Sequence, residues 1–455
     1  MGKLFGTDGI RGIAGEELTA EIAFRLGLSL SKVLHKENGG TPSVIIGKDT
    51  RLSGDMLEAA LSAGLCSMGC NVYLVGVVPT PAVAYLIVKN SASAGVMISA
   101  SHNPSEYNGL KVFGPKGMKL PDELENEIEN LIENDGESFS PTFGIGKVLD
   151  GNGMLDDYEN HIKERLADCR EAKRSILFDL SNGSASNTAK SIFNRETLPF
   201  CQCDFMAFDP NGININLNCG STQMSALCKY VTDGGYDIGI AFDGDADRCL
   251  MCDENGEIID GDKIIAALAS EMKKDGTLDG NTAVVTKLSN LGFSKMMKEE
   301  GIEVHQTDVG DRYVLEEMLR CGSRIGGEQS GHIILSRYAT TGDGQLTAAA
   351  GIGLLCRYPD KKASEIFGKM KKYPQVSVNV TVPNAMKKVI MSDPDVENEK
   401  NRIAAVLGDN GRIILRPSGT EALIRIMLEG PDTDTLRSLA EGLKAIITEK
   451  LNVQG

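Results

Sequence analysis

The chain has 455 residues and a formal net charge of −16, from 47 Lys and Arg against 63 Asp and Glu. At about 150 residues per domain, this length predicts about three domains and excludes a single one. A hydrophobic content of 41% and a charged content of 24% exclude wholesale disorder. The acidic balance argues against a nucleic-acid binder, which would show a basic face, but it permits small anionic substrates.

The sequence predicts a cytoplasmic protein that does not enter a membrane. Residues 1–12 include Lys3, Asp8 and Arg11 and lack the apolar core of a signal peptide. The longest nearly apolar run, residues 346–356, is shorter than the roughly 20 residues that span a bilayer. The 11 cysteines are thinly scattered and show no paired zinc spacing, which favours free thiols in a reducing compartment.

Three stretches of the chain share one order of elements: an apolar strand, a Gly/Ser/Asn/Asp loop, an amphipathic helix and a second strand. Short strands that alternate with helices are typical of βαβ units. The expected strand–helix–strand sets are 44–47, 55–68 and 71–75; 176–179, 187–193 and 203–207; and 283–286, 293–300 and 303–307.

The last part of the chain has a different pattern, which predicts a separate α+β domain. Its expected elements are strands at 375–382, 411–416 and 422–429 and helices at 396–407 and 432–451. Polar or Gly-rich linkers are expected at 134–153 and 358–374. The fold class is therefore three related α/β domains with mixed sheets, followed by an α+β domain. The expected boundaries are 1–153, 154–254, 255–368 and 373–455.

Residues 99–104 (SASHNP) follow an expected strand at 95–98 and contain two serines and a histidine. Asn-Pro favours a turn, so the residues themselves fit a plain turn well. His102 adjoins Ser101 directly, and neighbours in extended backbone point apart, so this histidine need not activate this serine as in a hydrolase. A third interpretation is an exposed serine that carries a phosphoryl group.

Residues 243–248 (DGDADR) follow an expected strand at 238–242 and place three carboxylates at a spacing of two. Such neighbouring anions are tolerable when a cation binds, so the loop predicts a divalent-metal site. An EF-hand is excluded, because its sixth position requires Gly and is Arg248 here.

Three further loops are rich in glycine and in hydrogen-bonding side chains. Residues 326–332 (GGEQSGH) could bring backbone close to a ligand's hydroxyl groups. Residues 416–420 (RPSGT), with Arg425, have the composition of a phosphate cradle, although a plain hairpin turn fits equally. Residues 5–12 (FGTDGIRG) form a glycine-dense opening that would position Arg11.

Taken in this order, the motifs resemble those of the α-D-phosphohexomutase superfamily. Residues 108–111 (NGLK) and 341–344 (TGDG) match it as well, so the resemblance runs from one end of the chain to the other. The FGTDGIRG opening and Gln329 resemble the glucosamine-phosphate branch. Lys287 instead occupies a position where other branches often carry lysine. The resemblance implies a four-domain, heart-shaped molecule with its active site in a central cleft.

The resemblance also implies roles for individual residues. Ser101 would be the phosphoserine, and it would bind one Mg²⁺ together with Asp243, Asp245 and Asp247. Lys111 and Arg248 would flank the transferring group, with Arg11 nearby, and Lys111, His102 and His332 are candidate acid/base groups. Glu328, Ser330 and His332 would bind the sugar. The phosphate that is not transferred would be held by Arg416, Ser418, Gly419, Thr420 and Arg425.

The implied activity interconverts glucosamine 6-phosphate and glucosamine 1-phosphate through a 1,6-bisphosphate and supplies UDP-N-acetylglucosamine and cell-wall precursors. A bisphosphate, a kinase or autophosphorylation would first load the serine. The oligomeric state stays open, a homodimer included. Three alternatives remain: a phosphomannomutase or phosphoglucomutase, a non-catalytic sugar-phosphate binding protein, and a metal-dependent phosphatase with Asp243 as nucleophile.

Overall fold

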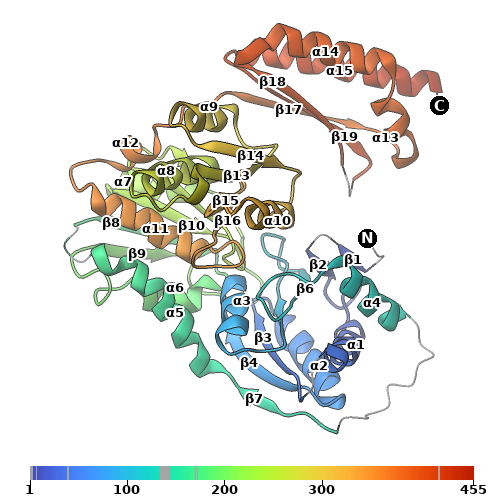
Figure 1. Ribbon diagram of the computed structural model, residues 1–455, viewed down its shortest axis with the longest axis vertical. Helices are drawn as coiled ribbons and strands as arrows, with labels where there is room; N and C mark the ends of the chain where they lie inside the picture. The colour runs from blue at the N-terminus through green and yellow to red at the C-terminus, as the bar shows by residue number, and fades with distance from the viewer. Residues whose placement is uncertain are drawn as a thin grey trace. The chain divides into compact units, whose positions relative to one another are not determined.

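The computed structural model describes residues 4–6, 8–37, 40–133, 144–169, 171, 173–418 and 421–454 (Figure 1). The chain divides into two compact units. The N-terminal unit comprises Met1–Leu288 and Glu300–Lys369, and the C-terminal unit comprises Ser289–Glu299 and Met370–Gly455. The strands of the described residues form four sheets, three in the first unit and one in the second.

The first sheet is mixed, and its strand β3 is parallel to both of its neighbours, β4 and β5. Its strands in spatial order are β1 (Phe5–Gly6), β2 (Gly9–Ile13), β6 (Tyr107–Phe113), β5 (Ala94–Ile98), β3 (Ser43–Lys48), β4 (Asn71–Val77) and β7 (Val148–Asp150). Its helices are α1 (Ala20–Glu37), α2 (Gly54–Ser67), α3 (Thr80–Lys89) and α4 (Asp122–Glu133).

Alternation of side chains along the strands explains why helices cover both faces of this sheet. Val44 and Ile46 join the buried cluster that contains the apolar residues of α1 and α2. Gly47 points to the opposite face, where an added Cβ would meet Val83 of α3 at 2.7 Å. Successive residues of a strand face opposite sides, so the small residue makes room for α3 while its larger neighbours pack under α1 and α2.

The second and third sheets repeat the pattern of parallel strands with helical connections. The second sheet orders β12 (Ile258–Ile259), β11 (Cys249–Asp253), β10 (Ile238–Phe242), β8 (Ser175–Asp179) and β9 (Gln202–Met206), with α5 (Leu155–Lys163), α6 (Ala185–Ile192) and α7 (Ser225–Gly234). The third orders β14 (Glu303–Thr307), β13 (Thr282–Thr286), β15 (Ile325–Gly327) and β16 (Ile333–Leu335), with α8 (Gly261–Lys274), α10 (Asp311–Cys321), α11 (Gly344–Arg357) and α12 (Ala363–Phe367).

The C-terminal unit is an antiparallel sheet covered by helices. Its strands are ordered β17 (Gln375–Thr381), β19 (Leu423–Glu429) and β18 (Arg412–Pro417), and its helices are α9 (Leu291–Glu299), α13 (Asn384–Met391), α14 (Pro394–Leu407) and α15 (Thr433–Gln454). Figure 1 shows α14 and α15 side by side over one face of this sheet. Ile424, Ile426 and Leu428 alternate along β19 into the core beneath them, which leaves Arg425 on the other face.

The expected elements are present, with bounds that differ by at most three residues from those expected, and the fold class is confirmed. Both expected linkers contain regular structure. Residues 148–150 form β7, which pairs with β4, and α12 lies within 358–374. Every helix in the described residues is too short or too polar to cross a lipid bilayer. All 11 cysteines lie in the described part of the chain and are free thiols.

Candidate active site

Ser101 lies in a tight turn at the carboxyl end of β5, where ligands commonly bind in parallel sheets. Its backbone is in the left-handed region, with φ of +52°, which is uncommon for a residue other than glycine. Its side chain is buried, and Oγ donates a hydrogen bond to Asp243 Oδ2 at 2.5 Å. The turn therefore aims the hydroxyl at the acidic loop after β10.

The acidic loop brings three carboxylates together. Asp243, Asp245 and Asp247 are all buried, and their nearest ligand oxygens lie within 4.8 Å of one another. Among the described residues, Asp245 Oδ1 and Asp247 Oδ1 accept no hydrogen bond although both atoms are buried. Burial and the two neighbouring carboxylates raise the pKa of Asp243 well above its usual value. Clustered hard oxygens with unused lone pairs fit a divalent cation such as Mg²⁺.

The carboxylates are surrounded by fixed cations. Lys111 Nζ donates to Asp245 Oδ2 at 2.7 Å and lies 3.7 Å from Asp247 Oδ2. Burial opposes the charge on Lys111, but Asp245, Asp8 and Asp247 outweigh it and raise its pKa above the usual value. Lys111 therefore stays protonated and acts as a point charge rather than as a base.

Arg248 and His102 form the second side of the site. Arg248 Nη1 lies 3.1 Å from His102 Nδ1, and the same nitrogen of His102 lies 3.4 Å from Ser101 Oγ. Burial and the charge of Arg248 lower the pKa of His102 to about 4. At neutral pH this histidine is therefore uncharged and can accept a proton.

His332 lies between two carboxylates, with Nδ1 3.7 Å from Asp247 and Nε2 3.8 Å from Asp311. Burial lowers its pKa, but the hydrogen bond and charge of Asp247 outweigh burial and raise it to about 9. The N–H of Gly342, however, donates to Nε2 at 3.1 Å, which requires a lone pair there. A cation at the triad would take up the charge of Asp247, so we assign the neutral Nδ1–H tautomer.

The glycine-rich loop between β15 and β16 packs against the acidic loop. The N–H of Cys249 donates to the carbonyl of Gly331 at 3.0 Å. Glu328 accepts a hydrogen bond from the N–H of Gly310 at 3.2 Å and one from the hydroxyl of Ser330 at 3.3 Å. The loop therefore presents a carboxylate and a hydroxyl group near the triad, as binding of a polyol requires.

Asp8, Lys119 and Asp311 form an ion-pair network that the sequence analysis did not assign. Lys119 Nζ lies 2.6 Å from Asp8 and 2.7 Å from Asp311, and Asp8 also contacts Lys111 and pairs with Arg11. Thr80 was missed as well, and its hydroxyl donates to Asp245 Oδ2 at 2.5 Å. Asp8 stands inside the FGTDGIRG motif, which was a signal for it, whereas Lys119 and Thr80 carry no local motif.

A cavity of about 380 Å³ opens beside this network. Its lining includes Lys119, Asp311, Arg312 and Tyr313, together with Gly310, whose N–H contacts Glu328. The volume is within the usual range for small-molecule sites. The space therefore adjoins Lys119 directly and reaches the glycine-rich loop only through the contact of Gly310 with Glu328.

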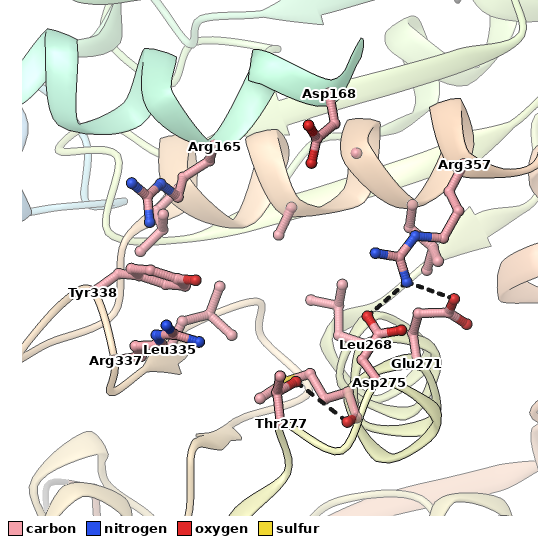
Figure 2. Close-up of a pocket in the computed structure, with 15 residues that line it drawn as sticks. Arg165, Asp168, Leu268, Glu271, Asp275, Thr277, Leu335, Arg337, Tyr338 and Arg357 are labelled. Atoms are coloured by element: carbon pink, nitrogen blue, oxygen red, sulfur yellow. Dashed lines mark hydrogen bonds and ion pairs between the residues drawn. The ribbon is translucent and has the colours of Figure 1, made fainter.

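A second cavity, of about 480 Å³, lies between α8, α11 and residues 335–338 and contains none of the candidate site residues (Figure 2). Arg357 reaches across one side of it to Glu271 at 2.9 Å and Asp275 at 2.6 Å. Arg165 lies over the ring of Tyr338 at 4.4 Å. Because Arg357 is already paired and the lining holds none of the candidate site residues, we assign this cavity no chemistry.

In the C-terminal unit, Arg416 and Arg425 are direct cross-strand partners on β18 and β19. Burial and the charge of Arg425 lower the pKa of Arg416. Two like charges placed opposite each other destabilise a sheet unless an anion binds there. The expected ligands Gly419 and Thr420 lie outside the described residues.

The turn beside this arginine pair is held by a lysine that the sequence analysis did not single out. The buried Lys387 Nζ donates to the carbonyls of Ser418 at 2.6 Å and Glu421 at 2.5 Å. Ser418 Oγ accepts a hydrogen bond from the N–H of Glu421 at 3.2 Å. Lys387 therefore stabilises the conformation of the turn through its main-chain carbonyls and does not serve as a ligand-binding cation.

Models of known protein families match most of the chain. Family models described as phosphoglucomutase/phosphomannomutase match four successive segments: domain I at residues 2–139, domain II at 156–256, domain III at 260–373 and the C-terminal domain at 378–446. The chain belongs to this family, the phosphohexomutases. It therefore has the four-domain α/β arrangement that the family models describe.

Curated relatives match this phosphohexomutase over nearly its whole length. The phosphoglucosamine mutase of Acetivibrio thermocellus is 46% identical over 99% of this chain and 100% of its own, and that of Clostridium novyi is 47% identical with the same coverage. With such relatives, the chain is an enzyme of the mutase type, an isomerase.

Solved structures share the fold of this phosphohexomutase at low identity. A phosphoglucomutase/phosphomannomutase family protein of Burkholderia thailandensis aligns over 96% of this chain and 95% of its own with a TM-score of 0.79 and 21% identity. The N-acetylphosphoglucosamine mutase of Aspergillus fumigatus, solved in complex with GlcNAc-6P and magnesium, aligns over 97% and 95% with a TM-score of 0.69 and 17% identity.

Proposed function

We propose that this phosphohexomutase interconverts glucosamine 6-phosphate and glucosamine 1-phosphate through a phosphorylated Ser101 and a 1,6-bisphosphate. The observation that carries the proposal is the contact of 2.5 Å between Ser101 Oγ and Asp243 inside a buried triad of carboxylates. The relatives of similar length, at 46–47% identity, are phosphoglucosamine mutases, which favours glucosamine over mannose or glucose phosphates. Lys287, which had suggested other branches, forms an ion pair with Asp308 at the surface.

In the first half-reaction, phosphorylated Ser101 donates its phosphoryl group to the free hydroxyl of the sugar phosphate. The bond from phosphorus to Oγ breaks and a bond from phosphorus to the sugar oxygen forms. The sugar hydroxyl loses its proton, and Ser101 Oγ takes up one proton in exchange. Ser101 is left as a hydroxyl that donates to Asp243. Because phosphoryl transfer needs in-line positioning and charge neutralisation rather than covalent work, fixed cations matter most. Lys111 and Arg248 supply them.

The triad fits Mg²⁺, which Asp243, Asp245 and Asp247 would hold together with a phosphoryl oxygen on Ser101. Bound there, the ion would neutralise part of the charge on the transferring group. Thr80 and Lys111 both donate to Asp245 Oδ2, so they orient that carboxylate and leave its Oδ1 unpaired.

In the second half-reaction, the bisphosphate presents its other phosphate to Ser101. Arg416, Ser418 and Arg425, with Gly419 and Thr420, hold the phosphate that is not transferred. The two arginines are cross-strand partners, and guanidinium groups suit a phosphate dianion, which would replace Glu421 as the partner of Arg425. Glu328, Ser330 and His332 bind the sugar, which they meet in two orientations during one cycle. Binding of this kind supplies orientation rather than chemistry.

The surroundings of the three acid/base candidates narrow the choice. Lys111 remains a cation because three carboxylates raise its pKa. His102 Nδ1 lies 3.4 Å from Ser101 Oγ, and its pKa of about 4 leaves it uncharged, so its position rather than its basicity makes it our first candidate for the acceptor of the hydroxyl proton. Burial and the charge of Arg248 keep it unprotonated between turnovers.

The proposal extends to the cellular setting. The enzyme would act in the cytoplasm on small sugar phosphates, without nucleic acid or membrane, and would supply an amino-sugar pathway. A bisphosphate, a kinase or autophosphorylation would first load Ser101. The functional domains would run over residues 1–153, 154–254, 255–368 and 373–455, each carrying one of the site loops.

Replacement of Ser101 tests the proposal directly. Ser101→Ala should abolish mutase turnover and remove one phosphate from the intact mass, because the only proposed carrier of the phosphoryl group is lost. The thermal midpoint should stay near that of the wild type. Turnover by Ser101→Ala protein that is free of wild type, or phosphate on another residue, would contradict the assignment.

The purified wild type and variants also distinguish the mutase from the alternative functions, a metal-dependent phosphatase, a non-catalytic binding protein and a mutase for another sugar. A phosphatase with Asp243 as nucleophile would lose phosphoenzyme formation in Asp243→Asn but not in Ser101→Ala. A binding protein without activity would turn over no substrate. Values of kcat/KM for glucosamine, glucose and mannose monophosphates decide among the sugar specificities, and we expect glucosamine to be preferred.

A further inference from the structure

The left-handed backbone of Ser101 is held from both sides by residues with no assigned role. The carbonyl of Ser101 accepts hydrogen bonds from Arg51 Nη2 at 2.8 Å and from Asn216 Nδ2 at 2.9 Å. The N–H of Ser101 donates to Ser99 Oγ at 2.9 Å. Since φ and ψ of a residue are set by its two flanking peptides, these bonds fix the conformation of Ser101 directly.

Two of these partners of Ser101, namely Arg51 and Ser99, are themselves held by one buried carboxylate, Asp49, which forms an ion pair with Arg51. Asp49 Oδ2 accepts hydrogen bonds from Ser99 Oγ at 2.6 Å and from Arg51 Nε at 2.9 Å. The backbone N–H of Arg51 donates to Asp49 Oδ1 at 3.0 Å, and neither side chain is exposed to solvent. One carboxylate therefore orients both the hydroxyl on one side of Ser101 and the guanidinium on the other.

Arg51 also organises the rest of the turn. Its Nη2 donates to the carbonyl of Asn103 at 2.9 Å, and its Nη1 donates to the carbonyls of Pro104 and, at 3.0 Å, Tyr107. With Ser101, four main-chain carbonyls converge on one planar guanidinium. Such a fork can satisfy several acceptors in fixed directions, which a lysine ammonium cannot reproduce.

The second donor to Ser101 comes from the α/β segment that carries the triad. Asn216 stands in the loop before α7, and it contacts the carbonyls of both Ser101 and Asn103. The neighbouring N–H of Leu52 donates to the carbonyl of Gly212 at 3.0 Å, and Thr50 Oγ1 donates to that of Asn182 at 2.6 Å. The 49–52 turn thus links the serine turn to the segment that supplies the carboxylates.

We propose that Arg51, oriented by Asp49 and assisted by Asn216, is a positioning residue that holds Ser101 Oγ in line with the carboxylate triad. The inference rests on the proposed function of Ser101 as phosphoryl carrier. Arg51 touches neither the triad nor the hydroxyl, so it acts through the backbone of Ser101. Geometry errors of about 1 Å at a reacting atom cost roughly 100-fold in rate, which gives the expected scale of the effect.

The test compares Arg51→Lys with Arg174→Lys. Arg174 is a matched control, because its Nη2 donates to four main-chain carbonyls, those of Leu355, Tyr358, Pro359 and Lys361, at 2.8–3.1 Å. Both changes keep the charge and lose the planar fork, so both should lower the thermal midpoint. Only Arg51→Lys should lower kcat, by about 10- to 100-fold, with KM for the sugar phosphate unchanged.

A second variant keeps the ion pair intact. Asn216→Ala removes one of two donors to the carbonyl of Ser101 and should lower kcat about three- to tenfold. If Arg51→Lys fails to fold, Asn216→Ala alone tests whether the donors to the carbonyl of Ser101 position its hydroxyl. Hydrolysis of phosphorylated Ser101 by water, followed by intact mass, should change less than transfer to the sugar, because water needs no fixed approach.

Wild-type kcat in both Arg51→Lys and Asn216→Ala would overturn the inference, as would an equal loss of kcat in Arg174→Lys. These outcomes differ from failure of the proposed function itself, in which the wild-type enzyme would neither carry phosphate on Ser101 nor convert glucosamine phosphates.

Discussion

At the scale of single residues, the site separates groups that carry charge permanently from groups that stay neutral. The carboxylates around Lys111 keep it protonated, whereas burial and the charge of Arg248 keep His102 unprotonated. The two side chains lie in one buried site, yet their neighbours move their pKa values in opposite directions. Strongly shifted pKa values of this kind are common at functional sites in enzymes.

Glu125 on α4 gives a prediction for the pH dependence of stability. Burial and the nearby Asp122 raise its pKa to about 7 from the model-compound value of 4.5. The folded protein therefore keeps this proton while the unfolded chain releases it, so the free energy of unfolding should fall as the pH rises from about 4.5 to 7. Glu125→Gln cannot ionise, so it removes this decrease in the free energy of unfolding. The difference in free energy of unfolding between Glu125→Gln and the wild type should therefore favour the variant more at about pH 8 than at about pH 5.

Urea unfolding of both proteins at the two pH values measures the difference. Glu123→Gln is the control, because it removes the same charge from an exposed position on the same helix. A gain for Glu125→Gln that is the same at both pH values would contradict the prediction.

At the scale of elements, the site depends on how closely two loops approach. Gly244 follows β10, and an added Cβ there would lie 2.5 Å from the carbonyl oxygen of Ser101 and 2.9 Å from Asn216 Nδ2. Main-chain atoms cannot move aside cheaply, so any side chain at this position would separate the triad from the serine turn. The glycine serves close approach rather than a left-handed turn.

Gly244→Ala should therefore lower both activity and stability. We expect kcat to fall about 100-fold and the free energy of unfolding to fall by about 1–3 kcal/mol. Gly353→Ala in α11 is the control, because the nearest atom to its added Cβ is Arg165 O at 4.0 Å. That change should leave kcat unaltered and add up to about 1 kcal/mol of stability. Steady-state kinetics and denaturant unfolding measure both; equal kcat in the two variants would refute the argument.

The elements themselves were predictable because their signals are local. The alternation of apolar strands and helices sets the three βαβ stretches, and the turn residues in 99–104 and 243–248 mark where strands end. Contacts between distant segments were not predictable in this way. Lys119, Asp311 and Thr80 reach the site through contacts with residues far away in the sequence, and nothing near them in sequence signals these contacts.

Strand β7 was not predicted either, because it too depends on a contact with a distant segment of the chain. Residues 144–153 are polar and rich in glycine, as a linker would be, yet 148–150 pair with β4 because that edge is free to accept a strand. Arg51 is another case, since an arginine in a polar turn looks exposed until its four carbonyl partners are known. The pairing of β7 and the burial of Arg51 both depend on partners from distant parts of the chain.

At the scale of the whole molecule, a chain with a net charge of −16 must bind dianionic sugar phosphates. In the proposed function, local cations would bind them: Lys111, Arg248 and Lys119 of the N-terminal unit and the Arg416–Arg425 pair of the C-terminal unit. Overall charge affects solubility and long-range steering, whereas affinity for a small ligand depends on the groups in contact with it. The acidic surface and the anionic substrate are therefore compatible.

Arg416→Ala tests the role of the pair in the C-terminal unit. The contact with the phosphate that is not transferred persists through the reaction, so its loss should raise KM about 10- to 100-fold and leave kcat nearly unchanged. Arg402→Ala, which removes an exposed arginine paired with Glu399 in the same unit, should leave both constants unchanged. A large loss of kcat at constant KM would place Arg416 in the chemistry instead.

The backbone of Ser101 restricts which side chain can serve there. Threonine offers the same hydroxyl group, but its branched β-carbon is strongly disfavoured at a φ of +52°. Chemistry alone would accept either alcohol, so conformation decides between them. The turn that presents the nucleophile thereby limits the evolutionary choices at this position to an unbranched alcohol.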